Sequence, residues 1–186
     1  MRNAARFGLT CMAAPLLAAC FTSQTSLYTG VTPLRPFEEG AVFTNMDGSK
    51  VEHITAHEAA PGIYHFVIES SDKIRDNQIV YRFFPLPDAP VGTLVEEVTT
   101  VAPCPSAATS RDKTCPIYIY GLWRVTPKSL EITNPDCSKV KGIAKLRGLS
   151  VSGGNCSFTN RKTLERALRL VVAAHPKPDD IVNIRQ

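Results

Sequence analysis

Residues 117–125 read IYIYGLWRV, the run of the chain that is richest in branched and aromatic side chains. Such residues favour β-strands, because they pack well on a pleated surface. Alternation along a strand places Tyr118 and Tyr120 on one face and Trp123 on the other. We expect the three rings to pack inside a core, with the lining of a binding groove as the alternative.

Similar runs lie on both sides of this segment at short intervals. Turn residues separate several of them, notably Asp47-Gly48 and Pro61-Gly62, and such turns are typical of hairpins. Many strands joined by short connections indicate an antiparallel sheet. Besides residues 117–125, the expected strands cover residues 41–46, 51–57, 63–68, 79–84, 94–101 and 130–132.

The last third of the chain changes character. Leu164, Ala167, Leu168 and Val171 follow the spacing of a helix that lies on a core. Asn160 can cap this helix and Pro176 ends it.

Residues 136–147 are less clear. Asp136 and Gly148 suit the two ends of a helix, whereas Gly142 and the alternating lysines also suit a strand. We favour a helix for 136–147, and a small hairpin around Gly153-Gly154. The predicted fold class is therefore α+β: an antiparallel β-sheet of six to seven strands with one or two C-terminal helices, stapled by disulfides.

The amino-terminal segment carries Arg2 and Arg6, followed by a mostly apolar run at residues 7–19. About 13 residues are too few for a membrane span, which needs ~20. A basic start and a short apolar run are typical of a secretory signal. The run ends in Leu17-Ala18-Ala19-Cys20. This resembles the lipobox of bacterial lipoproteins, in which a branched residue and two small residues precede a cysteine.

The resemblance implies that Cys20 receives a diacylglyceryl group and that the chain is cleaved before it. An ordinary signal peptide with a chance cysteine is the alternative. Two or three acyl chains hold a protein firmly on a membrane. Phe21, rather than Asp, follows the cysteine, and by analogy with enteric bacteria this favours the outer membrane. The predicted location is the bacterial cell envelope, on the periplasmic or surface face.

The resulting domain organisation has three parts. Residues 1–19 form the signal peptide, 20–37 the lipidated cysteine with a flexible tether, and 38–186 a single globular domain. The prediction of a tether is based on composition, since residues 21–36 contain six Ser or Thr. Without Arg2 and Arg6 the formal charge falls from +4 to +2. So small an excess gives no reason to expect a nucleic-acid partner.

Four further cysteines, Cys104, Cys115, Cys137 and Cys156, are expected to form two disulfides in an exported protein. Three pairings are possible. We favour Cys104–Cys115 and Cys137–Cys156, because each pair flanks a short loop-like stretch. A zinc site is the alternative, but it requires closely spaced cysteines that this chain lacks.

No motif predicts catalysis, a metal site or a cofactor. His53 and His57 are four residues apart, which on a strand is ~13 Å and too far for one ion. Glu96 and Glu97 point to opposite faces of a strand, so they cannot act as a catalytic pair. We expect them at solvated positions. The run from Gly148 to Ser152 lacks the last glycine of a nucleophile elbow.

Three functional hypotheses follow, in this order. The first is a non-enzymatic envelope lipoprotein, anchored to a membrane, that binds an unknown protein partner or supports an assembly. The second is a surface inhibitor of a host lysozyme or protease. For it the loop between Cys104 and Cys115, with Ser106, Arg111 and Lys113, is the candidate reactive segment. The third is an enzyme whose residues meet only in the folded chain.

Overall fold

The computed structural model describes residues 21–47, 50–70, 73–103, 114–138, 140–152, 155–174 and 177–184. Eight strands form a closed antiparallel β-barrel, in which each strand pairs with two others. The barrel strands are β2 (Val42–Asp47), β3 (Lys50–Ala60), β4 (Ile63–Ser70), β5 (Lys73–Pro85), β6 (Thr93–Pro103), β7 (Thr114–Val125), β8 (Ser129–Thr133) and β11 (Asp180–Ile184). The strands follow one another around the wall in chain order, and β11 closes the ring between β8 and β2.

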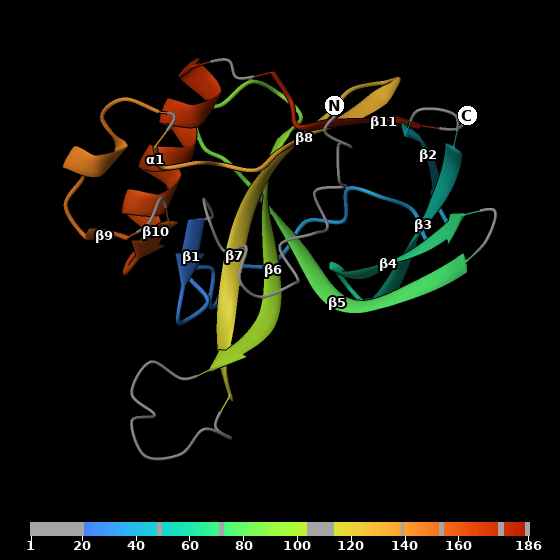
Figure 1. Cartoon of the computed structure of the whole chain (residues 1–186), viewed down its shortest axis with the longest axis horizontal. Coiled ribbons are helices and arrows are strands. Elements are labelled where there is room, and N and C mark those ends of the chain that lie inside the picture. The colour runs from blue at the N-terminus through green and yellow to red at the C-terminus, as the bar shows by residue number, and fades with distance from the viewer. Residues whose placement is uncertain are drawn as a thin grey trace, which may run out of the picture.

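The segment between β8 and β11 packs against the outside of the barrel. It contains a short 3-10 turn, η2 (Ile143–Lys145), the hairpin β9 (Leu149–Ser152) and β10 (Asn155–Phe158), and the helix α1 (Arg161–Ala174). A further strand, β1 (Phe21–Ser23), lies between β7 and β10. In Figure 1, α1 and these short strands occupy one side of the molecule, and β6 and β7 separate them from β2 to β5.

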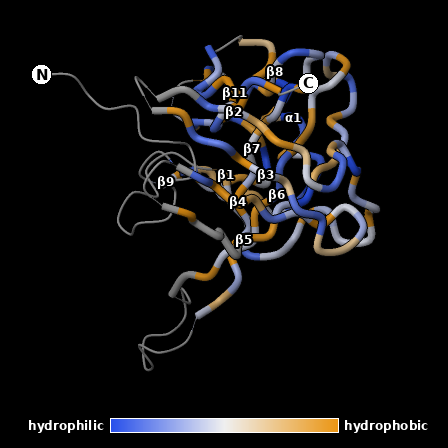
Figure 2. Tube along the Cα trace, turned by 90° about the vertical axis from the view of Figure 1, so that its right-hand side faces the viewer, coloured by the Kyte–Doolittle hydropathy of each residue, from blue (hydrophilic) through white to orange (hydrophobic). Residues whose placement is uncertain are grey.

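Two apolar cores share the wall formed by β5, β6 and β7. One fills the barrel and contains Leu94, Val98 and Trp123. The other lies between the outer wall and α1, and contains Val95 and Tyr120. Neighbouring residues of β6 therefore enter different cores, as strand alternation requires. This explains why residues 117–125 are apolar on both faces. Figure 2 shows apolar and polar residues interspersed along the strands of the barrel.

The predicted α+β class is wrong, because the chain is a mostly-β barrel with one helix among its described residues. The predicted strands are present, and most are longer than expected. The barrel strand that was not predicted is β11, which pairs with both β2 and β8 and turns an open sheet into a barrel. Only Val182 of β11 is buried, so its short sequence carries little strand pattern.

The helix predicted at residues 136–147 is also wrong. Asp136 accepts a hydrogen bond from the amide of Ser138 at 2.8 Å, which forms a local turn in place of a helix start. Gly142 has a φ of +93°, a left-handed conformation that a right-handed helix excludes. The helix over 161–174 is confirmed, with Asn160 accepting from the amide of Thr163 at 2.9 Å. The predicted hairpin around Gly153-Gly154 is confirmed as β9–β10, although its two turn glycines lie outside the described residues.

The flexible tether predicted at residues 20–37 is not found in the described part, 21–37. Phe21 is fully buried, and Tyr28 and Phe37 are 2% and 8% exposed. These three rings enter the two cores. The polar composition of the stretch concealed them, because its Ser and Thr residues lie between well-spaced aromatic anchors. Cys20 itself lies outside the described residues.

Candidate functional site

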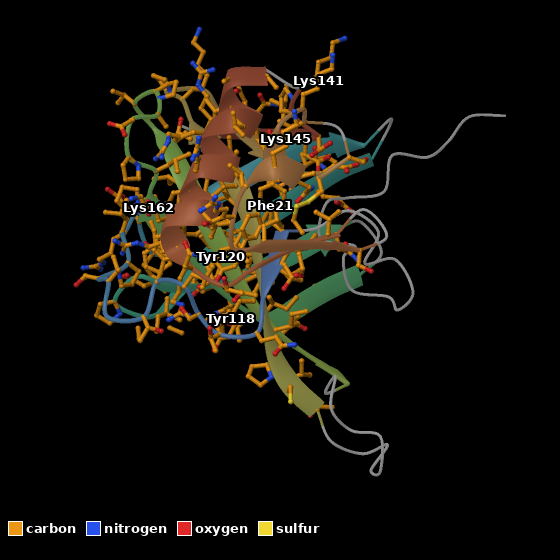
Figure 3. The ribbon with its side chains drawn as sticks, turned by 90° about the vertical axis from the view of Figure 1, so that its left-hand side faces the viewer. Phe21, Tyr118, Tyr120, Lys141, Lys145 and Lys162 are labelled. Atoms are coloured by element: carbon orange, nitrogen blue, oxygen red, sulfur yellow. A yellow bond between two sulfur atoms is a disulfide. The ribbon has the colours of Figure 1, made fainter. Side chains whose placement is uncertain are left out.

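The candidate site is formed by residues 21–28, the first described part of the chain, which directly follow Cys20 in the sequence. Phe21 lies opposite Tyr120 of β7 in antiparallel register and opposite Cys156 of β10 in parallel register. Its ring centroid is 4.9 Å from that of Phe158. Figure 3 labels Phe21 and Tyr120 on β1 and β7, in the region of α1. The first residue after the predicted lipid attachment is therefore already part of the core.

A buried carboxylate fixes the residues that follow β1. Glu97 of β6 is fully buried and forms an ion pair with Arg82 of β5. It also accepts hydrogen bonds from the hydroxyls of Ser26 at 2.9 Å and Tyr120 at 3.0 Å. The Tyr120 hydroxyl in turn accepts from the amide of Leu27 at 3.0 Å. We call Glu97, Arg82, Ser26 and Tyr120 the Glu97 cluster.

The Glu97 cluster works as an attachment point for the amino-terminal segment. Burial, and then the charge of Glu97, raise the pKa of Tyr120. This phenol therefore stays protonated and donates a hydrogen bond to Glu97. A buried carboxylate is tolerated when a cation and hydrogen-bond donors surround it. Here one of those donors, Ser26, comes from the predicted tether. The cluster therefore gains its full set of partners only when this segment is docked.

Tyr28 is the second attachment of the segment. Its ring stacks on Phe84 with centroids 4.2 Å apart, and the guanidinium of Arg161 lies 5.7 Å from the ring centre. Its hydroxyl donates to Glu165 of α1 at 3.4 Å. Burial first, and then the charge of Glu165, raise the pKa of Tyr28. The ring thus lies between the barrel wall and α1 and contacts both.

The aromatic residues of β7 are divided between the cores, as their alternation predicted. Tyr120 is 1% exposed on the outer wall and Trp123 is 7% exposed inside the barrel. Tyr118 is partly buried against the outer core and lies farther along β7 in Figure 3. The three rings pack in or against the two cores. Because they lie on opposite faces of β7, they do not line one groove together.

The acidic pair Glu96 and Glu97 points to opposite faces, as predicted, but the expectation of solvated positions is wrong. Glu96 is 8% exposed and faces the barrel interior between Leu94 and Val98. Its charge contributes to the raised pKa of Tyr81, after the larger effect of burial. Gly121 faces Glu96 across the β6–β7 pair, and any side chain there would collide with the carboxylate. The glycine at position 121 is the feature of the sequence from which a neighbouring buried side chain could have been predicted.

The histidines are arranged as strand geometry predicted. His53 and His57 lie on β3, and the ring of His57 stacks on that of His65 on β4, with centroids 5.2 Å apart. His57 also contacts Glu39 at 2.9 Å. Within the described ranges, no group of three or more potential ligands is placed to hold a metal ion.

One of the two expected disulfides lies within the described residues. Cys137 and Cys156 are bonded, with Cα atoms 5.8 Å apart, so the bridge connects the loop before η2 to the strand that pairs with β1. The other expected bridge joins Cys115 of β7 to Cys104, which lies outside the described residues. Ser106, Arg111 and Lys113 lie outside them as well.

A surface groove separates the end of α1 from the barrel wall. Leu122, Arg124, Glu131 and Val171 contribute to its lining, and Arg124 and Glu131 approach to 3.8 Å. This pair is a partly exposed surface ion pair. No helix within the described ranges is both long enough and apolar enough to cross a bilayer.

Comparison with known proteins gives no relative. No protein-family model, no curated protein and no solved structure matches this chain.

Proposed function

We propose that this protein is a lipoprotein of the bacterial envelope, held on a membrane through a lipid on Cys20, and that it acts as a non-enzymatic binding or accessory module. The sequence Leu17-Ala18-Ala19-Cys20 supports the lipid attachment. The position of Phe21 supports the same assignment, because a fully buried residue directly after Cys20 is suited to be the second residue of a mature chain.

The proposed anchor has a mechanical consequence. Consecutive Cα atoms are about 3.8 Å apart, so the lipid on Cys20 would be attached one residue from β1. The barrel would then be held against the membrane surface without a spacer. A domain mounted in this way presents a fixed set of surfaces to its surroundings, which suits an accessory module that contacts a partner in one orientation.

Metabolic labelling with palmitate tests the anchor. Wild-type protein should incorporate the label and fractionate with membranes, whereas Cys20→Ala should do neither. Cys11→Ala is the matched control, since it removes the other cysteine of the first twenty residues and should label normally. Equal labelling of wild type and Cys20→Ala would refute the proposal.

The β6–β7 hairpin is the surface that we propose for partner binding. The two strands pair over eleven positions, up to Pro103 opposite Thr114. In Figure 1 they extend well beyond the rest of the barrel. Val101, near the end of β6, is 66% exposed. Because the arm projects from the barrel, this apolar side chain lies within reach of another protein.

Crosslinking in cells from position 101 tests this assignment. A photoreactive residue at Val101 should capture a defined protein, and one at Val91, in the β5–β6 turn and fully exposed, should not. Capture of the same protein from both positions, or from neither, would argue against the arm.

The same arm keeps a second candidate open, a surface inhibitor of a lysozyme or protease. Inhibitors of this kind insert a protruding segment into a cleft, and the hairpin projects as that mechanism requires. Purified protein should then slow lysozyme or trypsin at stoichiometric concentration. Full activity of both enzymes would remove this candidate and leave the partner-binding proposal standing.

A further inference from the structure

Part of the barrel interior is filled by a side chain that no barrel strand supplies. Phe37 belongs to the irregular segment between β1 and β2, and it is 8% exposed. Its ring centroid lies 5.2 to 6.2 Å from five other rings. Those rings belong to Phe43, Tyr64, Phe66, Phe83 and Trp123. The barrel interior thus contains a site that matches one aromatic ring.

Side chains at the surface contribute much of what holds the Phe37 segment. Arg35 donates two hydrogen bonds to Glu58, at 2.7 and 2.5 Å, although its own side chain is 64% exposed. Glu39, also largely exposed, accepts from the amide of Glu58 at 2.5 Å and contacts His57. Exposed ion pairs contribute little to stability. The segment is therefore attached at separate points, and we expect it to be easier to displace than a strand that pairs along its length.

Backbone contacts add to the attachment, including two hydrogen bonds between residues 40–41 and Ala56 of β3 at 2.9 Å. The amide of Leu34 donates to the carbonyl of Phe83 at 2.7 Å, and the hydroxyl of Tyr64 donates to the carbonyl of Phe37 at 2.9 Å. A strand such as β3, by contrast, pairs along its length on both sides.

Trp123 adds an observation that points to a ligand. Its indole is 7% exposed, and its ring packs on Phe37, Phe66 and Phe83 inside the barrel. The indole Nε1 has no hydrogen-bond partner among the described residues. A buried indole N–H normally has one, because an unpaired polar group in an apolar environment is costly. One of the rings around Phe37 therefore carries a donor that has no partner while Phe37 fills the site.

We propose that this part of the barrel interior binds a small aromatic molecule that carries one uncharged carbonyl group. Its ring takes the place of Phe37 and its oxygen accepts the hydrogen bond of Trp123. A carboxylate is disfavoured, since burying its charge in this apolar site is costly. Eight-stranded barrels are wide enough either to be filled by their own side chains or to hold one small ligand. The proposal is independent of the lipid anchor.

If the ligand competes with Phe37, variants that weaken the docking of Phe37 should bind the ligand more tightly. A ligand that binds only when the segment is displaced has an apparent affinity that rises with the displaced fraction. Acetophenone is the probe, measured by calorimetry on the purified protein. Phe37→Ala should bind it at least about ten-fold tighter than wild type. Arg35→Ala, which weakens the attachment and leaves the interior intact, should bind it several-fold tighter. Arg124→Ala removes an exposed arginine from the outer wall and should not change the affinity.

The role of Trp123 has its own comparison. Ethylbenzene has the shape of acetophenone without the oxygen, so Phe37→Ala should bind it more weakly. Adding Trp123→Phe should abolish that preference. If Phe37→Ala does not fold, Arg35→Ala still decides the question. Equal affinity of Arg35→Ala and wild type would show that Phe37 is a fixed part of the core, and no gain in Phe37→Ala would show that the site does not accept the ring.

Discussion

At the scale of single residues, the least expected feature is Glu97, a carboxylate without solvent exposure in a protein of this size. Its partners come from β5, β7 and the segment after β1. Sequence analysis placed it at a solvated position, because a charged residue on a strand is usually exposed. Its burial depends on Arg82, Ser26 and Tyr120, which are far apart in the chain and meet only in the folded structure.

Removing the charge of Glu97 should destabilise the domain strongly. Glu97→Gln leaves Arg82 without its carboxylate partner, and breaking a buried pair in this way costs about 3–5 kcal/mol. We expect a lower midpoint of urea unfolding. Glu131→Gln is the matched control, since it belongs to a longer, more exposed pair with Arg124 and should change stability by less than ~0.5 kcal/mol. Equal midpoints for both variants would contradict the role of the cluster.

Glu58 should contribute to the acid sensitivity of the fold. The hydrogen bonds from Arg35 and then from the Gly62 amide hold its pKa below the ordinary value of 4.5. A lowered pKa means that the stabilisation is complete above the pKa of the unfolded chain and is lost as the pH falls through the folded value. Urea unfolding between pH 6 and pH 3 should therefore show a steeper loss for wild type than for Glu58→Gln.

Glu38→Gln provides the control for this pH series. The Glu38 side chain makes no hydrogen bond or ion pair within the described part of the chain, so the variant should follow the wild-type curve. A Glu58→Gln curve parallel to wild type would show that the Arg35–Glu58 contact does not stabilise the fold.

At the scale of elements, β1 has an influence out of proportion to its three residues. It connects β7 of the barrel to β10 of the insertion, and Phe21 fills the core between them. Its polar neighbours hid it in the sequence. An isolated phenylalanine in a Ser- and Thr-rich stretch has no local pattern, and only the sites offered by β7, β10 and Phe158 make it a strand.

Truncating Phe21 should therefore cost much of the stability. Phe21→Ala creates a cavity in a fully buried site, and such changes cost about 3–5 kcal/mol. Val91→Ala, at a fully exposed turn residue, should stay within ~0.5 kcal/mol of wild type. Thermal unfolding followed by circular dichroism measures both. An unchanged thermal unfolding transition in Phe21→Ala would instead support the flexible tether that the composition predicted.

At the scale of the whole molecule, two non-local connections define the architecture. The pairing of β11 with β2 closes the barrel, and the Cys137–Cys156 bridge holds the insertion together on the outside of the wall. The shared wall of β5 to β7 couples the two cores, because each core packs on one of its faces. We expect the barrel and the insertion to unfold together.

Removing the bridge tests this coupling. The Cys137→Ala, Cys156→Ala double variant opens a loop with a sequence separation of 19 residues, which the chain-entropy model values at about 3 kcal/mol. We expect one unfolding transition at lower temperature, seen equally in the near-ultraviolet signal and in the emission of Trp123, the single tryptophan. Two separate transitions would show that the outer core unfolds independently of the barrel.

The sequence by itself determined the features that depend on neighbouring residues. These are the positions of the strands other than β1 and β11, the two faces of β6 and β7, the helix capped by Asn160 and the pairing of Cys137 with Cys156. Alternation, capping and short loop closure act over a few residues up to about twenty, so they leave a readable pattern. The lipobox at Cys20 is a motif of the same local kind and remains a prediction.

Only the tertiary structure decided the closure of the barrel, the docking of residues 21–37 and the burial of Glu97. Each of these depends on partners more than about twenty residues away. Their free energy comes from contacts that a local pattern does not encode, such as β11 with β2 or Ser26 with Glu97. For the same reason, the composition of residues 21–37 predicted a flexible tether. In the structure a few well-spaced rings attach this segment, and their sites exist only in the folded domain.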